Sequence, residues 1–210
     1  RVRKIVHKES GDSTLGGRKL WIDSNIGRLN TDARGEYLGS FNANEFIITY
    51  YKDGSYETTN FDLSNRYKTN DIFIIEKLNK EKVVSVLYYN GGNKSYYVKR
   101  FKIETNITDK KFNFISETRG SKLILLSLCD KIMINYNYRM KNGDKKSKSI
   151  INYELVNIKG WKSIGNKLDN KMRMSGFEFK NIENDIQDDI LEEKNEKKNN
   201  KERNENLTLF

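Results

Sequence analysis

The 210-residue sequence has no proline, one cysteine and one histidine. A single cysteine, Cys129, excludes an internal disulfide framework and suits a reducing compartment, and its apolar neighbours predict a buried structural thiol. His7 has no cysteine near it in the sequence, so neither a zinc site nor a Ser/His/Asp triad can be assembled. No run of 18 or more apolar residues is present, which excludes a membrane-spanning helix. The first 17 residues also lack the apolar core of a signal peptide.

Phosphate-binding loops and paired catalytic carboxylates are missing as well. The segment "GGNK" lacks the strand-to-helix context of a P-loop, and the many acidic residues show no paired spacing on a defined face. The sequence therefore indicates no catalytic residue, no metal site and no cofactor.

Positive charge is abundant but unevenly distributed. The net charge is +10, yet residues 181–210 carry nine acidic and five basic side chains, so that residues 1–180 carry +14. Such a basic body favours a polyanionic partner, most often nucleic acid. A second explanation of the positive charge stays open. The sequence has only two alanines and many Lys, Asn and Ile residues, and an AT-rich genome imposes this bias on any protein.

Short apolar and β-branched runs predict an all-β domain over residues 19–180. Runs such as "EFIITYY", "KVVSVLYY", "SYYVKRF" and "KLILLSL" are four to eight residues long, and turn signals separate them. Residues 1–18 are predicted to be a polar lead-in. Residues 181–210 are predicted to be an acidic, Lys/Asn-rich and largely disordered tail, with a short amphipathic helix formed by isoleucines spaced four apart.

The turns recur at a regular interval. "YKDGSY" predicts a hairpin with a type I′ turn at Asp53–Gly54, and further turn signals follow at Asn90, Asp130 and Gly165, 35 to 40 residues apart. This period predicts a propeller-like array of about four units. Residues 141–148, "KNGDKKSK", are predicted to form a loop rather than a strand pair, so the array is expected to be open or incomplete.

Two basic clusters border predicted strands. We expect the strand "SYYV" to end at Lys99 and Arg100, because its continuation would place a lysine on an apolar face. Arg119 and Lys122 lie at a glycine-bearing turn before the next strand. Both clusters are therefore expected at exposed strand ends, where the planar fork of an arginine suits phosphate.

Several motifs together identify a family. "KLWIDSNIGRLNT", "EFIITYYKDGSY", "SYYVKRFKI" with "TRGSKLILL", and "IKGWKSIGNKL" occur in this order. They resemble the C-terminal domain of the A subunit of bacterial type IIA DNA topoisomerases, and most closely the topoisomerase IV-like branch. No match to the glycine-rich basic box of gyrase is present, and the segment "LGGRKL", which resembles it weakly, lacks the paired arginines. This departure favours relaxation or decatenation over gyrase-style supercoiling.

The resemblance implies a non-catalytic β-pinwheel of about four blades. Its outer basic surface is expected to bind and bend double-stranded DNA and to present it to the strand-passage core. The positions that match this surface are Lys99, Arg100, Lys102, Arg119, Lys122, Lys159, Lys162 and Lys167. The implied partners are DNA, the A-subunit core and the B subunit, in an A2B2 enzyme of the cytoplasmic nucleoid and not of a membrane. ATP and Mg²⁺ would act through regions outside this chain.

Two other functions remain as alternatives. The first is a protein-binding β-propeller whose basic charge reflects codon drift. The second is a module that binds single strands or RNA through the aromatic residues of "SYYVKRF", although this string lacks the glycine-aromatic core of the common RNA-recognition motif.

Overall fold

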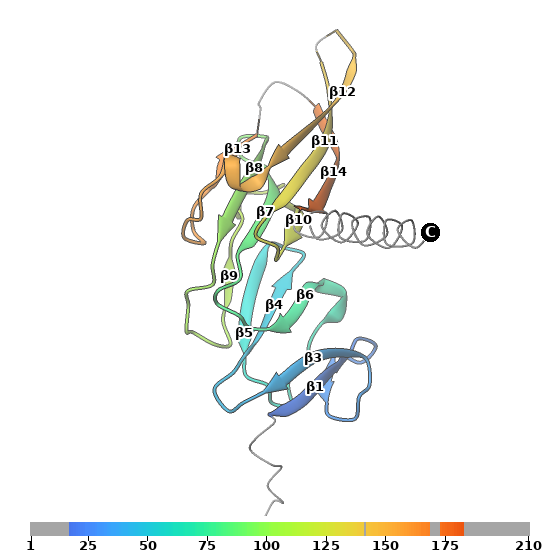
Figure 1. The fold of residues 1–210 in the computed structure, drawn as a ribbon, viewed down its shortest axis with the longest axis vertical. Helices are drawn as coiled ribbons and strands as arrows, with labels where there is room; N and C mark the ends of the chain where they lie inside the picture. The colour runs from blue at the N-terminus through green and yellow to red at the C-terminus, as the bar shows by residue number, and fades with distance from the viewer. Residues whose placement is uncertain (1–16, 141, 169–172, 183–210) are drawn as a thin grey trace, which may run out of the picture. The chain divides into compact units, whose positions relative to one another are not determined.

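The computed structural model describes residues 17–140, 142–168 and 173–182. These residues form fourteen β-strands, one turn of 3-10 helix and one four-residue α-helix, as Figure 1 shows. The prediction of an all-β protein is therefore confirmed. The helix α1 (Asn152–Leu155) is too short to cross a bilayer, and the described residues contain no other candidate for a membrane span.

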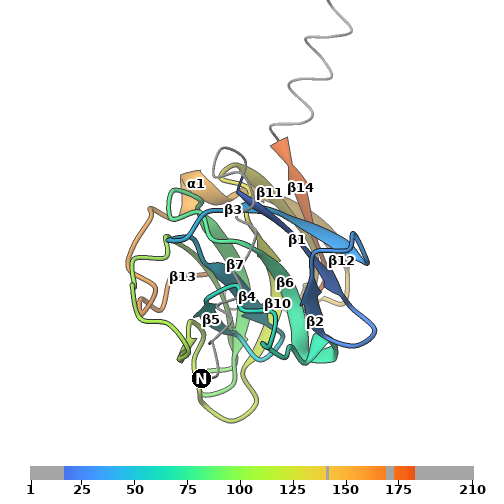
Figure 2. The ribbon, with the colours of Figure 1, turned by 90° about the horizontal axis from the view of Figure 1, so that it is seen from below.

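The chain divides into two compact units, of which the first comprises residues 1–79 and 105–114. It contains two antiparallel sheets with the strand orders β2-β1-β3 and β6-β4-β5-β9. In both views β1 and β3 run side by side (Figures 1 and 2). The strands are β1 (Arg18–Asp23), β2 (Arg28–Asn30), β3 (Glu36–Phe41), β4 (Ile47–Tyr51), β5 (Ser55–Thr59), β6 (Ile72–Lys77) and β9 (Lys111–Asn113).

The first unit confirms one hairpin and corrects its turn. β4 and β5 pair antiparallel, with Tyr50 opposite Tyr56. Of the turn residues only Gly54 has a positive φ, at 84°, and its amide donates to the carbonyl oxygen of Tyr51 over 3.1 Å. A type I′ turn needs two consecutive residues with positive φ, so the predicted turn type is wrong. The hairpin instead uses a three-residue loop that ends in a left-handed glycine.

The second unit comprises residues 80–104 and 115–210. Its sheets have the strand orders β10-β7-β8-β13 and β12-β11-β14. The strands are β7 (Val84–Asn90), β8 (Ser95–Phe101), β10 (Lys122–Ser127), β11 (Ile132–Arg139), β12 (Lys145–Ile151), β13 (Asn166–Lys167) and β14 (Arg173–Asn181). A buried cluster that includes Leu87, Val98, Ile134 and Tyr136 forms its core.

Strand exchange gives the described residues a pinwheel-like topology. β9 follows β7 and β8 in the chain, yet it joins the sheet of β4, β5 and β6. β13 likewise follows β11 and β12 but pairs with β8. Four small antiparallel sheets connected in this way agree with the predicted array of about four units, in which each unit depends on its neighbours for strands.

The third predicted unit is wrong in detail. Asp130 lies in the connection between β10 and β11, whereas the hairpin turn of this sheet contains Asn142 and Asp144. The residues that follow, predicted to be a loop, form β12, which pairs with β11 from Ile151 to Lys145. The predicted lead-in and tail lie almost entirely outside the described residues.

Candidate nucleic-acid interface

Lys99 is buried rather than exposed at a strand end. β8 continues to Phe101, and Lys99 is paired with Val86 of β7. Its side chain is 1% exposed, and its Nζ donates hydrogen bonds to the carbonyl oxygens of Trp161, at 2.6 Å, and Ser163, at 2.7 Å. Burial lowers the pKa of Lys99 to about 8. The predicted strand end is therefore wrong, because loop carbonyls satisfy an ammonium group on the apolar face of the sheet.

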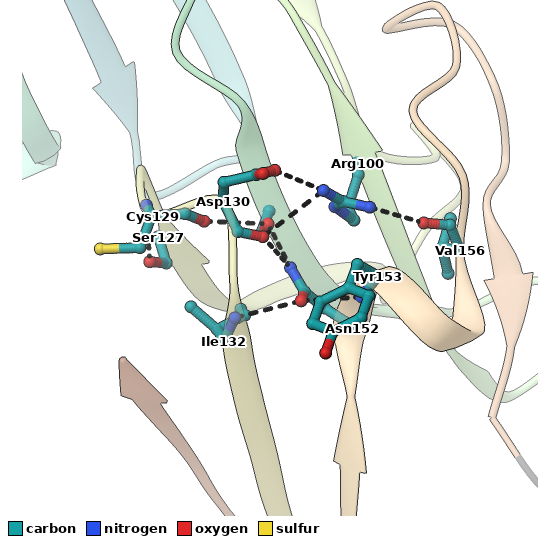
Figure 3. Close-up of polar contacts among 9 residues, drawn as sticks. Arg100, Ser127, Cys129, Asp130, Ile132, Asn152, Tyr153 and Val156 are labelled. Carbon is teal, nitrogen blue, oxygen red and sulfur yellow. Dashed lines mark hydrogen bonds and ion pairs between the residues drawn. The ribbon is translucent and has the colours of Figure 1, made fainter. Parts of the chain in front are cut away.

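Arg100 is also buried, at 6% exposure, on the opposite face of β8. Figure 3 shows its guanidinium between Asp130, with which it forms an ion pair, and Val156, whose carbonyl oxygen accepts a bond of 3.1 Å. The fully buried Asn152 donates to the carbonyl oxygen of Asp130 over 2.9 Å and accepts from the amide of Ile132 over 3.1 Å. The fork of Arg100 thus joins two segments of the protein, and it is not available to a phosphate at the surface.

Both cations instead position the loop of residues 156–165. The amide of Lys159 donates to the carbonyl oxygen of Arg100 over 3.0 Å, and the hydroxyl of Tyr88 donates to Ile164 over 2.8 Å. Burial raises the pKa of Tyr88 to about 12, so this hydroxyl stays a donor. Gly165 completes the loop with a φ of 90°.

Three other predicted cations lie in or just after this loop. Lys159 and Lys162 in the loop are exposed, and so is Lys167 at the end of β13. Lys99 and Arg100 instead bind main-chain carbonyl groups of this segment and are buried. Sequence reasoning missed the distinction because the acceptors lie 30 to 64 residues away in the chain.

Arg119 and Lys122 are exposed at a second turn. Gly120 has a φ of 86°, and the Oγ of Ser121 accepts a 3.0 Å bond from the amide of Gly91 in the β7–β8 turn. The remaining predicted cation, Lys102, is half-buried and forms a 2.8 Å ion pair with Glu81. The predicted exposure therefore holds for Arg119 and Lys122.

The sheet separates two of these exposed lysines. Lys122 shares a row with Tyr89 and Tyr96. Lys167 is opposite Tyr97, which is the next residue along β8. Since successive residues of a strand face opposite sides, Lys122 and Lys167 lie on opposite faces and at opposite edges of this sheet.

Further exposed cations lie in and just before residues 141–148, which the sequence predicted to be a loop. Arg139 ends β11, and Lys145, Lys146 and Lys148 belong to β12. A strand signal was absent because "KKSKSII" has no alternation of apolar residues at its beginning. Within the part of the chain that the structure describes, no group of three or more His, Cys, Asp or Glu side chains could hold a metal ion.

The fold and its surface define a class of protein: an all-β domain, built of small sheets with exchanged strands, that displays cations on its outer loops. Residues 28–173 match the family described as the topoisomerase C-terminal domain of Bacteroidota. The chain belongs to this family of topoisomerase C-terminal domains, as the sequence motifs predicted.

A full-length relative supports the same assignment. The chain is 35% identical, over 121 residues, to the A subunit of DNA topoisomerase 4 from Borreliella burgdorferi. The aligned part is 56% of this chain and 19% of that relative, so the chain spans about a fifth of its length.

Proposed function

We propose that this domain binds and bends duplex DNA without reading its sequence, as the DNA-presenting module of a type IIA topoisomerase A subunit. The observation that supports it most strongly is the family membership over residues 28–173, combined with exposed cations at two turns of the second unit. The contacts proposed are made by Arg119, Lys122, Lys159, Lys162 and Lys167, with Lys102 at the margin. Lys99 and Arg100 are excluded as contacts because they are buried.

The proposed mechanism is electrostatic. Each phosphate that a lysine or arginine neutralises releases counterions, so affinity falls as salt concentration rises. Bending the duplex costs on the order of a few kcal/mol, which contacts at more than one surface must offset. Lys122 and Lys167 lie on opposite faces of one sheet, so a duplex that reaches both must curve around its edge.

We further propose that this domain acts within a larger parent enzyme. The A-subunit core and the B subunit would be the protein partners, in an A2B2 assembly of the bacterial nucleoid. Cleavage, ATP hydrolysis and Mg²⁺ binding would belong to those parts, and this domain would supply substrate geometry alone. The similarity to a topoisomerase 4 protein favours relaxation or decatenation.

A salt series on the 210-residue chain tests the binding. A linear duplex of about 40 base pairs and the matching single strand are titrated at several salt concentrations, and dyes at the duplex ends report bending. We expect tighter binding of the duplex, with a log–log slope of about −4, and a shorter end-to-end distance. Absent duplex binding at low salt, or a slope near zero, would refute the proposal in favour of a protein-binding module. Tighter binding of the single strand would favour the third alternative.

A further inference from the structure

The sheet β12-β11-β14 has one apolar and one polar face. Ile134, Tyr136 and Met174 pack into the core of the second unit. Toward the β11–β12 turn, the residues on the other face are exposed and polar, and we call them the β11 polar face: Asn137, Arg139, Lys145, Ser147 and Ser175. Figure 1 shows the three strands side by side near the end of the β11–β12 hairpin.

Like charges lie directly opposite one another on this face. The register places Arg139 of β11 opposite Lys145 of β12. Directly opposed like charges destabilise a sheet. Arg139 and Lys145 form no ion pair with any residue that the structure describes. The nearby Asp144 accepts a 2.6 Å hydrogen bond from Asn142 within the turn.

Edge protection does not account for this charge. Lysines on an edge strand such as β12 prevent unwanted pairing of sheets. Arg139, however, belongs to β11, which is the central strand of the sheet. A cation on a central strand, opposite a second cation, therefore indicates a ligand of opposite charge.

A hollow lies beside this pair of cations. It has a volume of about 540 Å³, and all five residues of the β11 polar face line it. The other lining residues form the cross-strand row between the row of Asn137 and the row of Arg139: Tyr138, Lys146 and Met174. Because their side chains alternate to the other face of the sheet, this row contributes main chain to the floor of the hollow.

Neutral donors in the hollow are already held in place. Ser147 Oγ donates a 2.7 Å hydrogen bond to Asn137 Oδ1, which fixes the orientation of this amide. At the irregularity where β14 passes Asn137, Gly176 has a φ of 63°, and a Cβ there would lie 2.7 Å from Asn137 Nδ2. The glycine therefore makes room for the amide group. Hydroxyl and amide groups beside Arg and Lys are a usual donor set for backbone phosphates of DNA.

We propose that the β11 polar face binds backbone phosphates of duplex DNA. The guanidinium of Arg139 and the ammonium of Lys145 contact phosphate oxygens, and the amide of Asn137 and the hydroxyl of Ser175 donate hydrogen bonds to the same strand, while Ser147 keeps Asn137 oriented. The inference rests on the proposed function and adds to it a second contact surface, on residues that the sequence motifs do not include.

The chain offers a matched control for the test. Arg139→Gln/Lys145→Gln removes two cations from the β11 polar face. Lys146→Gln/Lys148→Gln removes two from β12 that are opposite Tyr138 and Tyr136 and thus belong to the other face. Both double variants change the net charge equally, so long-range electrostatics affects them alike. Removing the opposed pair relieves repulsion, so we expect its melting temperature to be unchanged or higher.

The test of the β11 polar face measures duplex affinity and its salt slope for the two double variants and the wild-type chain. We expect Arg139→Gln/Lys145→Gln to bind roughly tenfold or more weakly and to reduce the log–log salt slope by about two. Lys146→Gln/Lys148→Gln should lose only a few-fold and retain the slope. Equal losses would overturn the inference in favour of diffuse attraction. No loss in either variant would overturn it as well, while the proposed function stands. A wild-type chain that binds no duplex would refute the proposed function and this inference together.

Discussion

Replacement of Lys99 by methionine tests whether a buried ammonium group holds the loop of residues 156–165. Methionine keeps the length of the apolar stem and removes the donor of the two bonds to Trp161 and Ser163. Each charge-assisted hydrogen bond contributes about 1.5–3 kcal/mol. Removal of the buried charge recovers its desolvation cost, which a pKa lowered from 10.5 to about 8 places at about 3 kcal/mol. The net loss expected at pH 7 is therefore about 0–3 kcal/mol.

The pH dependence of this loss has a definite sign. The pKa of Lys99 in the folded protein, about 8, lies below its unfolded value of 10.5. Between these values the unfolded chain binds more protons, so the Lys99 contribution to the free energy of unfolding rises with pH. The difference between wild type and Lys99→Met should therefore widen by up to about 2 kcal/mol from pH 7 to pH 9.5.

Urea denaturation at these two pH values measures both effects. A Trp21→Phe background leaves Trp161 as the fluorescent reporter of the second unit. Lys102→Met is the control, because this lysine is only half-buried and pairs with Glu81 at the surface; we expect a loss below about 1 kcal/mol. No loss in Lys99→Met at pH 9.5 would contradict the loop contact, and a difference that stays constant with pH would contradict the shifted pKa.

Two further predictions concern the same loop. Gly165→Ala should destabilise the second unit by about 2 kcal/mol or more, because the new Cβ would lie 2.4 Å from the carbonyl oxygen of Val98 at a positive φ. The control is Gly143→Ala, which has a similar φ of 94° but open space around it and should cost only about 1 kcal/mol. Urea denaturation measures both losses, and equal losses would disprove the packing argument. Lys159→Gln/Lys162→Gln should leave the melting temperature unchanged and reduce the salt slope of duplex binding by about two; an unchanged slope would remove this loop from the interface.

Local signals were sufficient for much of the fold. Alternating apolar residues and glycine-bearing turns identified β4, β5, β7, β8 and β10, because each forms a strand whose own sequence fits a half-buried surface. Tyr56 of β5 and Tyr88 of β7 are buried. The beginning of β12, residues 145–148, escaped prediction because its partner β11 makes it a strand, whereas these residues themselves are all exposed.

For the basic residues too, some properties follow from the sequence and others from the tertiary structure. By itself, the sequence determined the class of fold, the family and the excess of positive charge, since these depend on composition, periodicity and the order of motifs. Only the tertiary structure decided which cations face solvent. Lys99 and Arg100 are buried because carbonyl groups far along the chain replace their water, and Arg139 meets Lys145 because a strand register aligns them. Residue type fixes a charge, but its function depends on partners that only folding brings together.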